Sequence, residues 1–397
     1  MGVPRVGAGG VEGPHRQGGL TPSRPVASSR VLFPLAAAYA AFVLPASVLP
    51  MLGIAPALPG LASPAAHAHE MLFGFALLVV AGHQLGPSGP RRLALLLALW
   101  IAARLSFLLA PASLLAVTAN AAFALVLGAQ LAPRLFGRAK KLRNLALPLV
   151  LAGLAACAAA AELARRLGAP ALERDVLTVA VVAFSLLMLF MGGRLIAPAA
   201  AGHFHRLGGN LEARVQPRLE GALIVALLLA AVACALPGPR AVAIAGAGAL
   251  IAGGTLALVR LARWRLWAAR GRRDLACIGI GYAWVALGLA AWGAAILAAS
   301  RELAALHAIT VGGLGTLTFN VMALTRARLA RADPAASAIP PWGTAFLALA
   351  CVARIAADFL PAARLALLAF AASLWSAAFL LLLARFAALD RPARRAA

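Results

Sequence analysis

The residues best suited to chemistry in this sequence are histidines that lie in or beside long apolar runs. His67 and His69 open one such run, within His-Ala-His-Glu-Met at residues 67–71, and His307 lies near the start of another. Neutral imidazole is a common ligand of haem iron, copper and zinc, and ionisable groups at membrane depth are usually functional. We therefore interpret the three histidines as candidate haem or metal ligands. The alternative is that His69 bonds a neighbouring helix and His67 faces water.

Helix geometry limits how His67 and His69 can act together. Ser63 and Pro64 are a plausible cap and first turn for a helix that carries both. Residues two apart on a regular helix point about 200° apart, so the first turn is irregular or the two histidines serve different sites. Glu70 lies three residues after His67, roughly on its face, and is a candidate to orient that imidazole.

His83 is a further candidate ligand on the same run. It follows His69 by fourteen residues, which is about 21 Å along a helix axis and about 40° around it. Two histidines stacked in this way could each serve a haem near one face of a bilayer. A bis-histidine haem needs a second histidine at each depth, and no other apolar run supplies one at the depth of His83.

Two arginines, Arg104 and Arg354, also fall within apolar runs. Asp358 follows Arg354 by four residues and shares its helix face, which favours a buried ion pair. The functional alternative is that Arg104 or Arg354 holds a haem propionate or another anion near the histidines. Tyr282, one of only two tyrosines, is a candidate partner for a flat cofactor lying beside the small residues that follow His307.

The remaining candidate ligands fit simpler explanations. We place His203 and His205 in a solvated loop. The cysteines each lie inside an apolar run without metal-type spacing, which is typical of small packing residues; they are Cys157, Cys234, Cys277 and Cys351.

The elements that must position these residues are transmembrane helices. Of the 397 residues, 63% are hydrophobic and 12% are charged, whereas a soluble chain is about half apolar and about a quarter charged. A span needs about 20 apolar residues, so the sequence predicts an all-α, polytopic transmembrane helical bundle of about twelve spans. The predicted spans are 31–52, 67–85, 92–110, 112–133, 144–164, 175–197, 219–236, 241–261, 275–298, 303–325, 342–360 and 365–387.

The distribution of basic residues predicts the orientation of these spans. With the amino terminus cytoplasmic, 28 of the 36 Lys and Arg residues fall in cytoplasmic segments, six on the opposite side and two within spans. By the positive-inside rule both termini are cytoplasmic. The net charge of +24 is thus spread in short clusters between apolar runs, which argues against a nucleic-acid partner and for the lipid bilayer as the environment.

The chain divides into three predicted parts. Residues 1–30 are rich in Gly, Pro, Ser and Arg, as expected of a disordered cytoplasmic tail. Residues 31–390 form the predicted transmembrane helical domain, and residues 391–397 a short cytoplasmic carboxyl-terminal tail.

Five short motifs stand in order along the predicted spans. The two most specific are His-Ala-His-Glu-Met-Leu-Phe-Gly-Phe at 67–75 and His-Ala-Ile-Thr-Val-Gly at 307–312, which continues to Met322 and Thr325-Arg326. The weaker three are Arg143-Asn144-Leu145, Gly192-Gly193-Arg194 and Gly281-Tyr282-Ala283-Trp284. Together they resemble the NnrS family of bacterial membrane proteins, over roughly residues 31–390.

The resemblance implies a twelve-span protein of the bacterial inner membrane that binds haem b and copper. It implies a role in nitric oxide metabolism or protection from nitrosative stress, as in denitrification, with nitric oxide or a related small molecule as partner. Carried over by position, His67, His69 and His307 would be the haem or metal ligands. An enzyme of this kind would be an oxidoreductase acting on nitric oxide, and it would need an electron donor, which is unknown.

The sequence departs from the family pattern at two places. After the second span, His83-Gln-Leu-Gly-Pro-Ser-Gly stands where the family usually has a longer Pro-Asn-Trp-Thr-Gly stretch. After Thr325-Arg326 the sequence has only Arg328 and Arg331, where members often carry another histidine. These departures concern the implied copper binding more than the implied haem binding.

Two other classes of protein also have twelve spans. A secondary transporter would use Arg104, Arg354 and Asp358 as a substrate or ion site, but acidic residues, frequent at mid-membrane in transporters, are nearly absent from the span centres of this chain. A haem–copper oxidase or nitric oxide reductase subunit would carry an adjacent His-His pair and a His/Tyr spacing on one helix, and both are missing.

Overall fold

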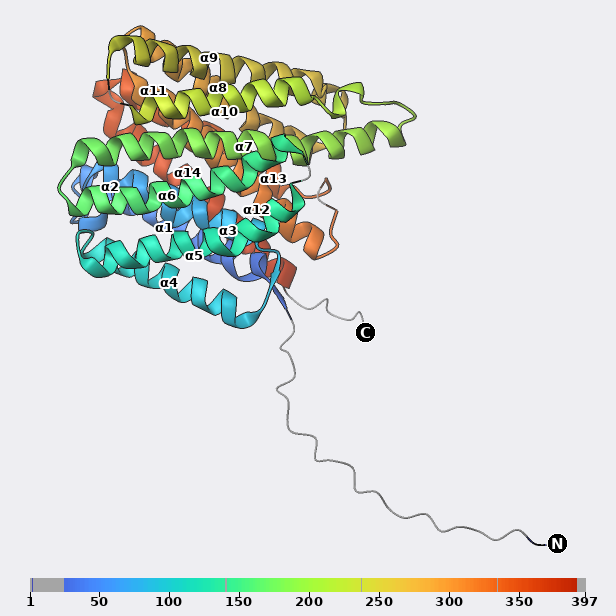
Figure 1. The fold of residues 1–397 in the computed structure, drawn as a ribbon, viewed down its shortest axis with the longest axis horizontal. Helices are drawn as coiled ribbons and strands as arrows, with labels where there is room; N and C mark the ends of the chain where they lie inside the picture. Colours follow the sequence, from blue (N-terminus) through green and yellow to red (C-terminus); the bar gives the residue numbers. More distant parts are fainter. Residues whose placement is uncertain (1, 3–24, 140, 237, 334, 391–397) are drawn as a thin grey trace.

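The computed structural model describes residue 2 and residues 25–139, 141–236, 238–333 and 335–390. Helices lie side by side along the long axis of the molecule (Figure 1). Within the described ranges, twelve are long and apolar enough to cross a membrane, which confirms the predicted fold class. We call the end where the first helix begins and the last one finishes the arginine-rich end, and the opposite end, where α2 and α11 lie, the histidine end.

The twelve spans are built from helical elements that follow one another along the chain. Spans one to four contain α1 (Ser28–Val48), then α2 (Pro64–His69), η3 (Glu70–Ala76) and α3 (Leu77–Gln84), then α4 (Pro90–Leu109), then α5 (Leu114–Arg138). Spans five to eight contain η4 (Leu142–Leu145) with α6 (Ala146–Arg166), then α7 (Pro170–Arg206), then η5 (Glu212–Arg214) with α8 (Pro217–Ala235), then α9 (Arg240–Arg263). Spans nine to twelve contain α10 (Arg273–Leu297), then α11 (Glu302–His307), η7 (Ala308–Gly315) and α12 (Thr316–Leu329), then α13 (Ile339–Phe359), then α14 (Arg364–Asp390). The short elements are β1 (Val26–Ala27), β2 (Pro87–Ser88), η1 (Leu49–Leu52), η2 (Pro59–Leu61), η6 (Leu266–Ala268) and η8 (Pro361–Ala363).

Packing between the spans repeats every four spans. Spans two, six and ten touch one another, and 72–78% of their apolar stretches is buried, against 28–61% for the other nine. Span four packs on span five, span eight on span nine, and span twelve on span one. The packing therefore recurs with a period of four spans, and spans two, six and ten form a central trio. Because four is an even number of crossings, the three central helices run in the same direction.

The amino-terminal boundary lies a little earlier than predicted. α1 begins at Ser28, and β1 just before it pairs antiparallel with β2, with Val26 opposite Ser88. The short sheet ties the start of span one to the turn that follows span two. The rest of the predicted tail, apart from residues 2 and 25, lies outside the described residues, as do residues 391–397.

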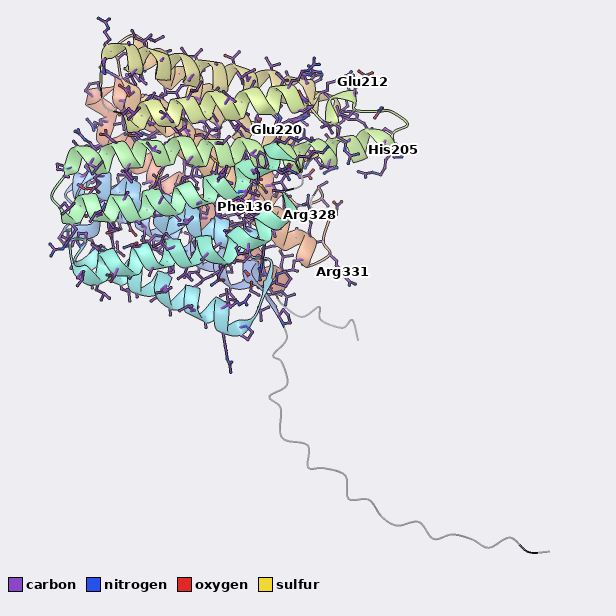
Figure 2. All side chains as sticks on the ribbon, in the orientation of Figure 1. Phe136, His205, Glu212, Glu220, Arg328 and Arg331 are labelled. Carbon is purple, nitrogen blue, oxygen red and sulfur yellow. The ribbon has the colours of Figure 1, made fainter. Side chains whose placement is uncertain are left out.

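Span six is longer than the sequence predicted. The prediction of a loop at His203 and His205 is wrong, because α7 continues through Pro198 to Arg206 and carries both histidines on its last turns. Alanine has the highest helix propensity, and the Ala-rich stretch around Pro198 continues the helix. His205 lies near the far end of α7, beyond the arginine-rich end of the neighbouring spans (Figure 2).

Candidate functional site

Spans two and ten each contain a π-helical interruption at the histidine end. In span two, α2 ends at His69 and the π-helix η3 follows; in span ten, α11 ends at His307 and the π-helix η7 follows. π-helical segments are rare and are frequent at functional sites. Two of the three central helices thus place a histidine directly before a change in helical winding, at the same end of the bundle.

The start of span two follows the sequence-based expectation. The Ser63 hydroxyl accepts a hydrogen bond from the Ala66 amide at 3.1 Å, and Pro64 occupies the first turn. The turn that carries His67 and His69 is regular α-helix. Of the two alternatives for these histidines, the structure therefore favours separate surroundings for the two rings.

His69 lies in a buried network of charged side chains. Its Nδ1 is 3.1 Å from Glu70 Oε1, and its Nε2 is 2.7 Å from Glu162 Oε1 in a close contact that lacks the alignment of a hydrogen bond. The ring stacks on Phe107, with centroids 4.2 Å apart and planes 12° apart. Both ring nitrogens face carboxylates, so the protein's own acidic groups hold this imidazole.

Glu70 belongs to the same network. Its carboxylate accepts hydrogen bonds from the Tyr39 hydroxyl and from Arg104, whose other terminal nitrogen donates to Asn120. The predicted pairing of Glu70 with His67 is wrong, because Tyr39 and Arg104 draw the carboxylate toward spans one and three, where it meets His69. Arg104 is almost completely buried, with both terminal nitrogens engaged.

Sequence reasoning missed the acidic and basic groups that complete this network. Arg165 lies 3.3 Å from Glu162 and also pairs with Glu173, while its guanidinium lies over the Phe107 ring, 4.5 Å from the centroid. The spacing of three residues between Glu162 and Arg165 was the one signal for a shared helix face. Nothing in the sequence, however, links the end of span five to span two.

His67 and His307 belong to a second group. Each lies within electrostatic range of the Arg354 guanidinium, and His67 lies within that range of His307. His307 Nδ1 is 2.8 Å from the Leu303 carbonyl oxygen. A carbonyl can only accept, so Nδ1 carries the proton and Nε2 keeps its lone pair. His67 Nδ1 is buried with no hydrogen-bond partner among the described residues.

Helix α13 borders this second group. Arg354 Nη1 lies 2.8 Å from Asp358 Oδ1, which confirms the ion pair predicted from their spacing. The other carboxylate oxygen of Asp358 is buried and has no partner among the described residues. The Cys351 thiol donates to the His307 carbonyl oxygen at 3.7 Å. Spans ten and eleven therefore pack together here, and His67 of span two lies within electrostatic range of both His307 and Arg354.

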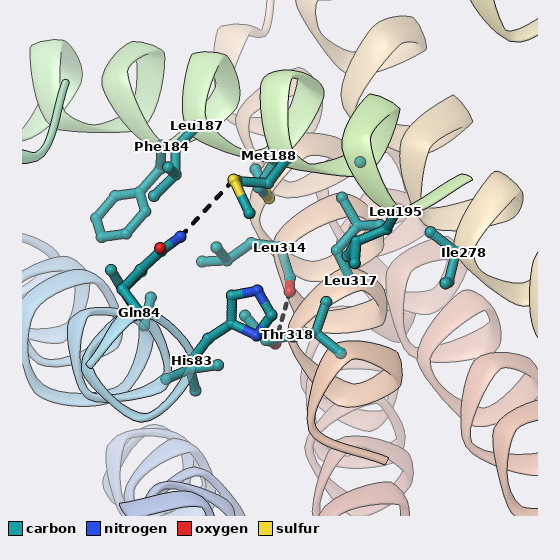
Figure 3. Close-up of a pocket in the computed structure, with 16 residues that line it drawn as sticks. His83, Gln84, Phe184, Leu187, Met188, Leu195, Ile278, Leu314, Leu317 and Thr318 are labelled. Atoms are coloured by element: carbon teal, nitrogen blue, oxygen red, sulfur yellow. Dashed lines mark hydrogen bonds between the residues drawn. The ribbon is translucent and has the colours of Figure 1, made fainter. Parts of the chain in front are cut away.

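His83 and Tyr282 lie elsewhere in the bundle. His83 stands at the opposite end of span two and points, with Gln84, into a largely apolar cavity of about 80 Å³ between spans two, six, nine and ten (Figure 3). Met188, Leu314 and Leu317 are among the lining residues (Figure 3). Tyr282 is fully buried against Trp264, with ring centroids 5.2 Å apart. Neither joins the histidines of the other end.

The arrangement of these residues limits which of the expected haem and metal sites they could form. Within the described ranges, no three His, Cys, Asp or Glu side chains gather as a metal ion would require. His69 lies between Glu70 and Glu162, in a different group from His67 and His307. His67 and His307 remain as the candidate haem ligands: His67 Nδ1 has no hydrogen-bond partner among the described residues, and His307 is bonded through Nδ1, which leaves its Nε2 for a ligand.

Comparisons with known proteins show the family of this chain. A search of curated proteins finds no match to this chain. The family model described as "NnrS protein" matches residues 27–392. That stretch includes all twelve spans, the charged network around His69 and the group formed by His67, His307 and Arg354. The chain belongs to the NnrS family.

Proposed function

We propose that this chain binds haem at the histidine end, through the imidazoles of His67 and His307, and acts in nitric oxide metabolism or protection from nitrosative stress. The observation that carries the proposal is the placement of these two histidines at one end of two of the three central spans, within electrostatic range of each other and of Arg354. Family membership supplies the link to haem and nitric oxide.

Residues around His67 and His307 support haem binding because they fix the tautomer of His307 and supply a cation for a propionate. The Leu303 carbonyl holds the His307 ring in one tautomer, an arrangement that raises ligand basicity in known metal sites. Arg354 lies within electrostatic range of both imidazoles and keeps one carboxylate partner, Asp358. Its guanidinium is the candidate to bind a haem propionate. Haem iron, when bound, supplies a redox centre that takes nitric oxide as a ligand.

Copper enters the proposal through family membership only, and no residues of this chain are assigned to it. The electron donor is likewise unassigned. We propose the bacterial inner membrane as the location, with both termini cytoplasmic, because basic residues concentrate at the end of the bundle where α1 begins.

The transporter alternative gains less support from the geometry. Arg104 gives both terminal nitrogens to Glu70 and Asn120, and Arg354 pairs with Asp358. The two arginines thus sit in different groups and do not form one substrate site. The cavity in Figure 3 is largely apolar, whereas a site for a charged substrate would present polar groups.

The nitric oxide role predicts a spectroscopic response. Nitric oxide added to the reduced, haem-loaded protein in detergent should shift the Soret band, and the shift should saturate at one equivalent per haem. A His205→Ala variant, altered at an exposed position on the last turn of α7, should respond in the same way. A Soret band unmoved by excess nitric oxide would refute the nitric oxide role and leave haem binding as a separate question.

A further inference from the structure

A second group of polar residues forms near the arginine-rich end, apart from the histidines. Five segments of the chain contribute: η4, α7, α8, α9 and α10. Its charged members are Arg143, Arg194, Arg260 and Glu220, which we call the arginine cluster (Glu220 is labelled in Figure 2). The three weaker sequence motifs, at residues 143–145, 192–194 and 281–284, all meet around it.

The charges of the arginine cluster do not balance. Glu220 Oε2 lies 3.5 Å from Arg143 Nη1 and 3.7 Å from Arg260 Nη2, whereas a charge-assisted hydrogen bond is about 2.7–2.9 Å long. Arg194 lies within electrostatic range of the other three and donates to Asn144 at 2.6 Å. Two guanidinium groups lie within 4 Å of one loosely held carboxylate and a third is within electrostatic range of it, so the cluster carries an excess of positive charge.

Buried donors without partners point to a missing polar group. Arg260 Nε, Trp264 Nε1 and the Tyr282 hydroxyl have no hydrogen-bond partner among the described residues, nor has Arg143 Nη1. The first three side chains belong to residues only 5%, 1% and 0% exposed. Buried polar groups are almost always hydrogen-bonded, so these donors call for an acceptor.

The packing shows that the Arg260, Trp264 and Tyr282 side chains are close to one another. The Arg260 guanidinium lies over the Trp264 ring, 5.2 Å from its centroid, and Tyr282 meets that ring edge-on at 5.2 Å and 71°. Two glycines of α7 make this approach possible. A Cβ at Gly193 would lie 2.5 Å from Arg260 Nη2, and one at Gly192 would lie 2.8 Å from the Tyr282 ring.

We propose that the arginine cluster, with Trp264 and Tyr282, binds a phosphate group, supplied either by an anionic phospholipid headgroup or by free phosphate. Guanidinium groups match the geometry of phosphate oxygens, and the neutral donors complete the shell. Gln216 Oε1, an unpartnered acceptor beside Arg260 within the described residues, suits a protonated oxygen or a bridging water. Arg194 is exposed and Arg143 partly exposed, so the ligand enters from their side.

Tyr282→Phe is the sharpest test, because it removes only the hydroxyl beside Arg260 and keeps the buried ring. Full-length protein in detergent would be titrated with inorganic phosphate by calorimetry, and bound phosphatidylglycerol would be measured by native mass spectrometry. A hydrogen bond to a charged group is worth roughly ten-fold or more in affinity. We expect Tyr282→Phe and Arg143→Gln each to weaken binding about ten-fold, while Tyr282→Phe leaves the ligand-free melting temperature unchanged.

The matched control is Arg328→Gln, which removes an exposed arginine at the same end of the bundle but outside the cluster (Figure 2). It should bind as the wild type does. Saturable phosphate binding without retained lipid identifies the free anion as ligand. Retained phosphatidylglycerol that is lost in Tyr282→Phe identifies the lipid. Binding of neither, or binding equal in wild type, Tyr282→Phe and Arg143→Gln, overturns the proposal.

Discussion

Replacing His307 with alanine is expected to remove haem from the purified protein. Loss of a group that only orients a metal ligand costs about 10–100-fold in affinity, so loss of the ligand itself should cost at least about 100-fold. His307 offers a free Nε2 because its Nδ1 donates to the Leu303 carbonyl. The haem-to-protein ratio, measured by absorption against total protein after expression with excess haem precursor, is the readout.

Two comparisons separate ligation from general damage to the site. Imidazole added to His307→Ala should restore part of the haem binding, because it can fill the space that the side chain leaves. His69→Ala should keep haem while lowering stability, since the ring of His69 packs among Glu70, Glu162 and Phe107, apart from His67 and His307. Full haem occupancy in His307→Ala, or haem loss confined to His69→Ala, would contradict the assignment of His67 and His307.

Replacing Arg104 with methionine should destabilise the bundle strongly. Breaking a buried ion pair by removing one partner costs about 3–5 kcal/mol, because the other charge stays buried. Here the change would leave Glu70 and Asn120 without their shared donor at a position that is 3% exposed. Unfolding in detergent, followed by heat or denaturant, should report the loss.

The chain offers both a control and a rescue for this variant. Arg92→Met removes an exposed arginine from the same helix and should be close to neutral. Adding Glu70→Gln to Arg104→Met should recover part of the loss, because the uncompensated charge disappears, and the two changes should therefore be non-additive. An Arg104→Met protein as stable as Arg92→Met would show that the buried network contributes little.

Much of the fold could be predicted because membrane spans depend on local properties. A span needs only sufficient apolar length, and breaks at Pro, Gly and charged residues mark its ends. The cap at Ser63 and the ion pair of Arg354 with Asp358 also depend on neighbours within four residues. The central trio of spans two, six and ten depends on packing between distant helices, which hydropathy does not encode. The extension of α7 to Arg206 was missed because Pro198 resembled a break.

The candidate site could likewise be predicted only where its features depend on residues near in sequence. The angle between residues two apart on a helix indicated that His67 and His69 could serve different sites, and the structure places them in different groups. The partners of His69 could not be predicted, because Glu162 lies some 90 residues away in sequence and faces it only through tertiary packing. The π-helices after His69 and His307 likewise have no local signature in the sequence.

Haem binding at the histidine end is best tested by the reduced-minus-oxidised absorption spectrum of the wild-type protein, purified in detergent after expression with excess haem precursor. Iron and copper would be measured on the same sample. Haem ligation by His67 and His307 predicts a Soret band, iron in proportion to protein, and loss of both in His307→Ala. A colourless protein without proportionate iron would contradict haem binding by this chain.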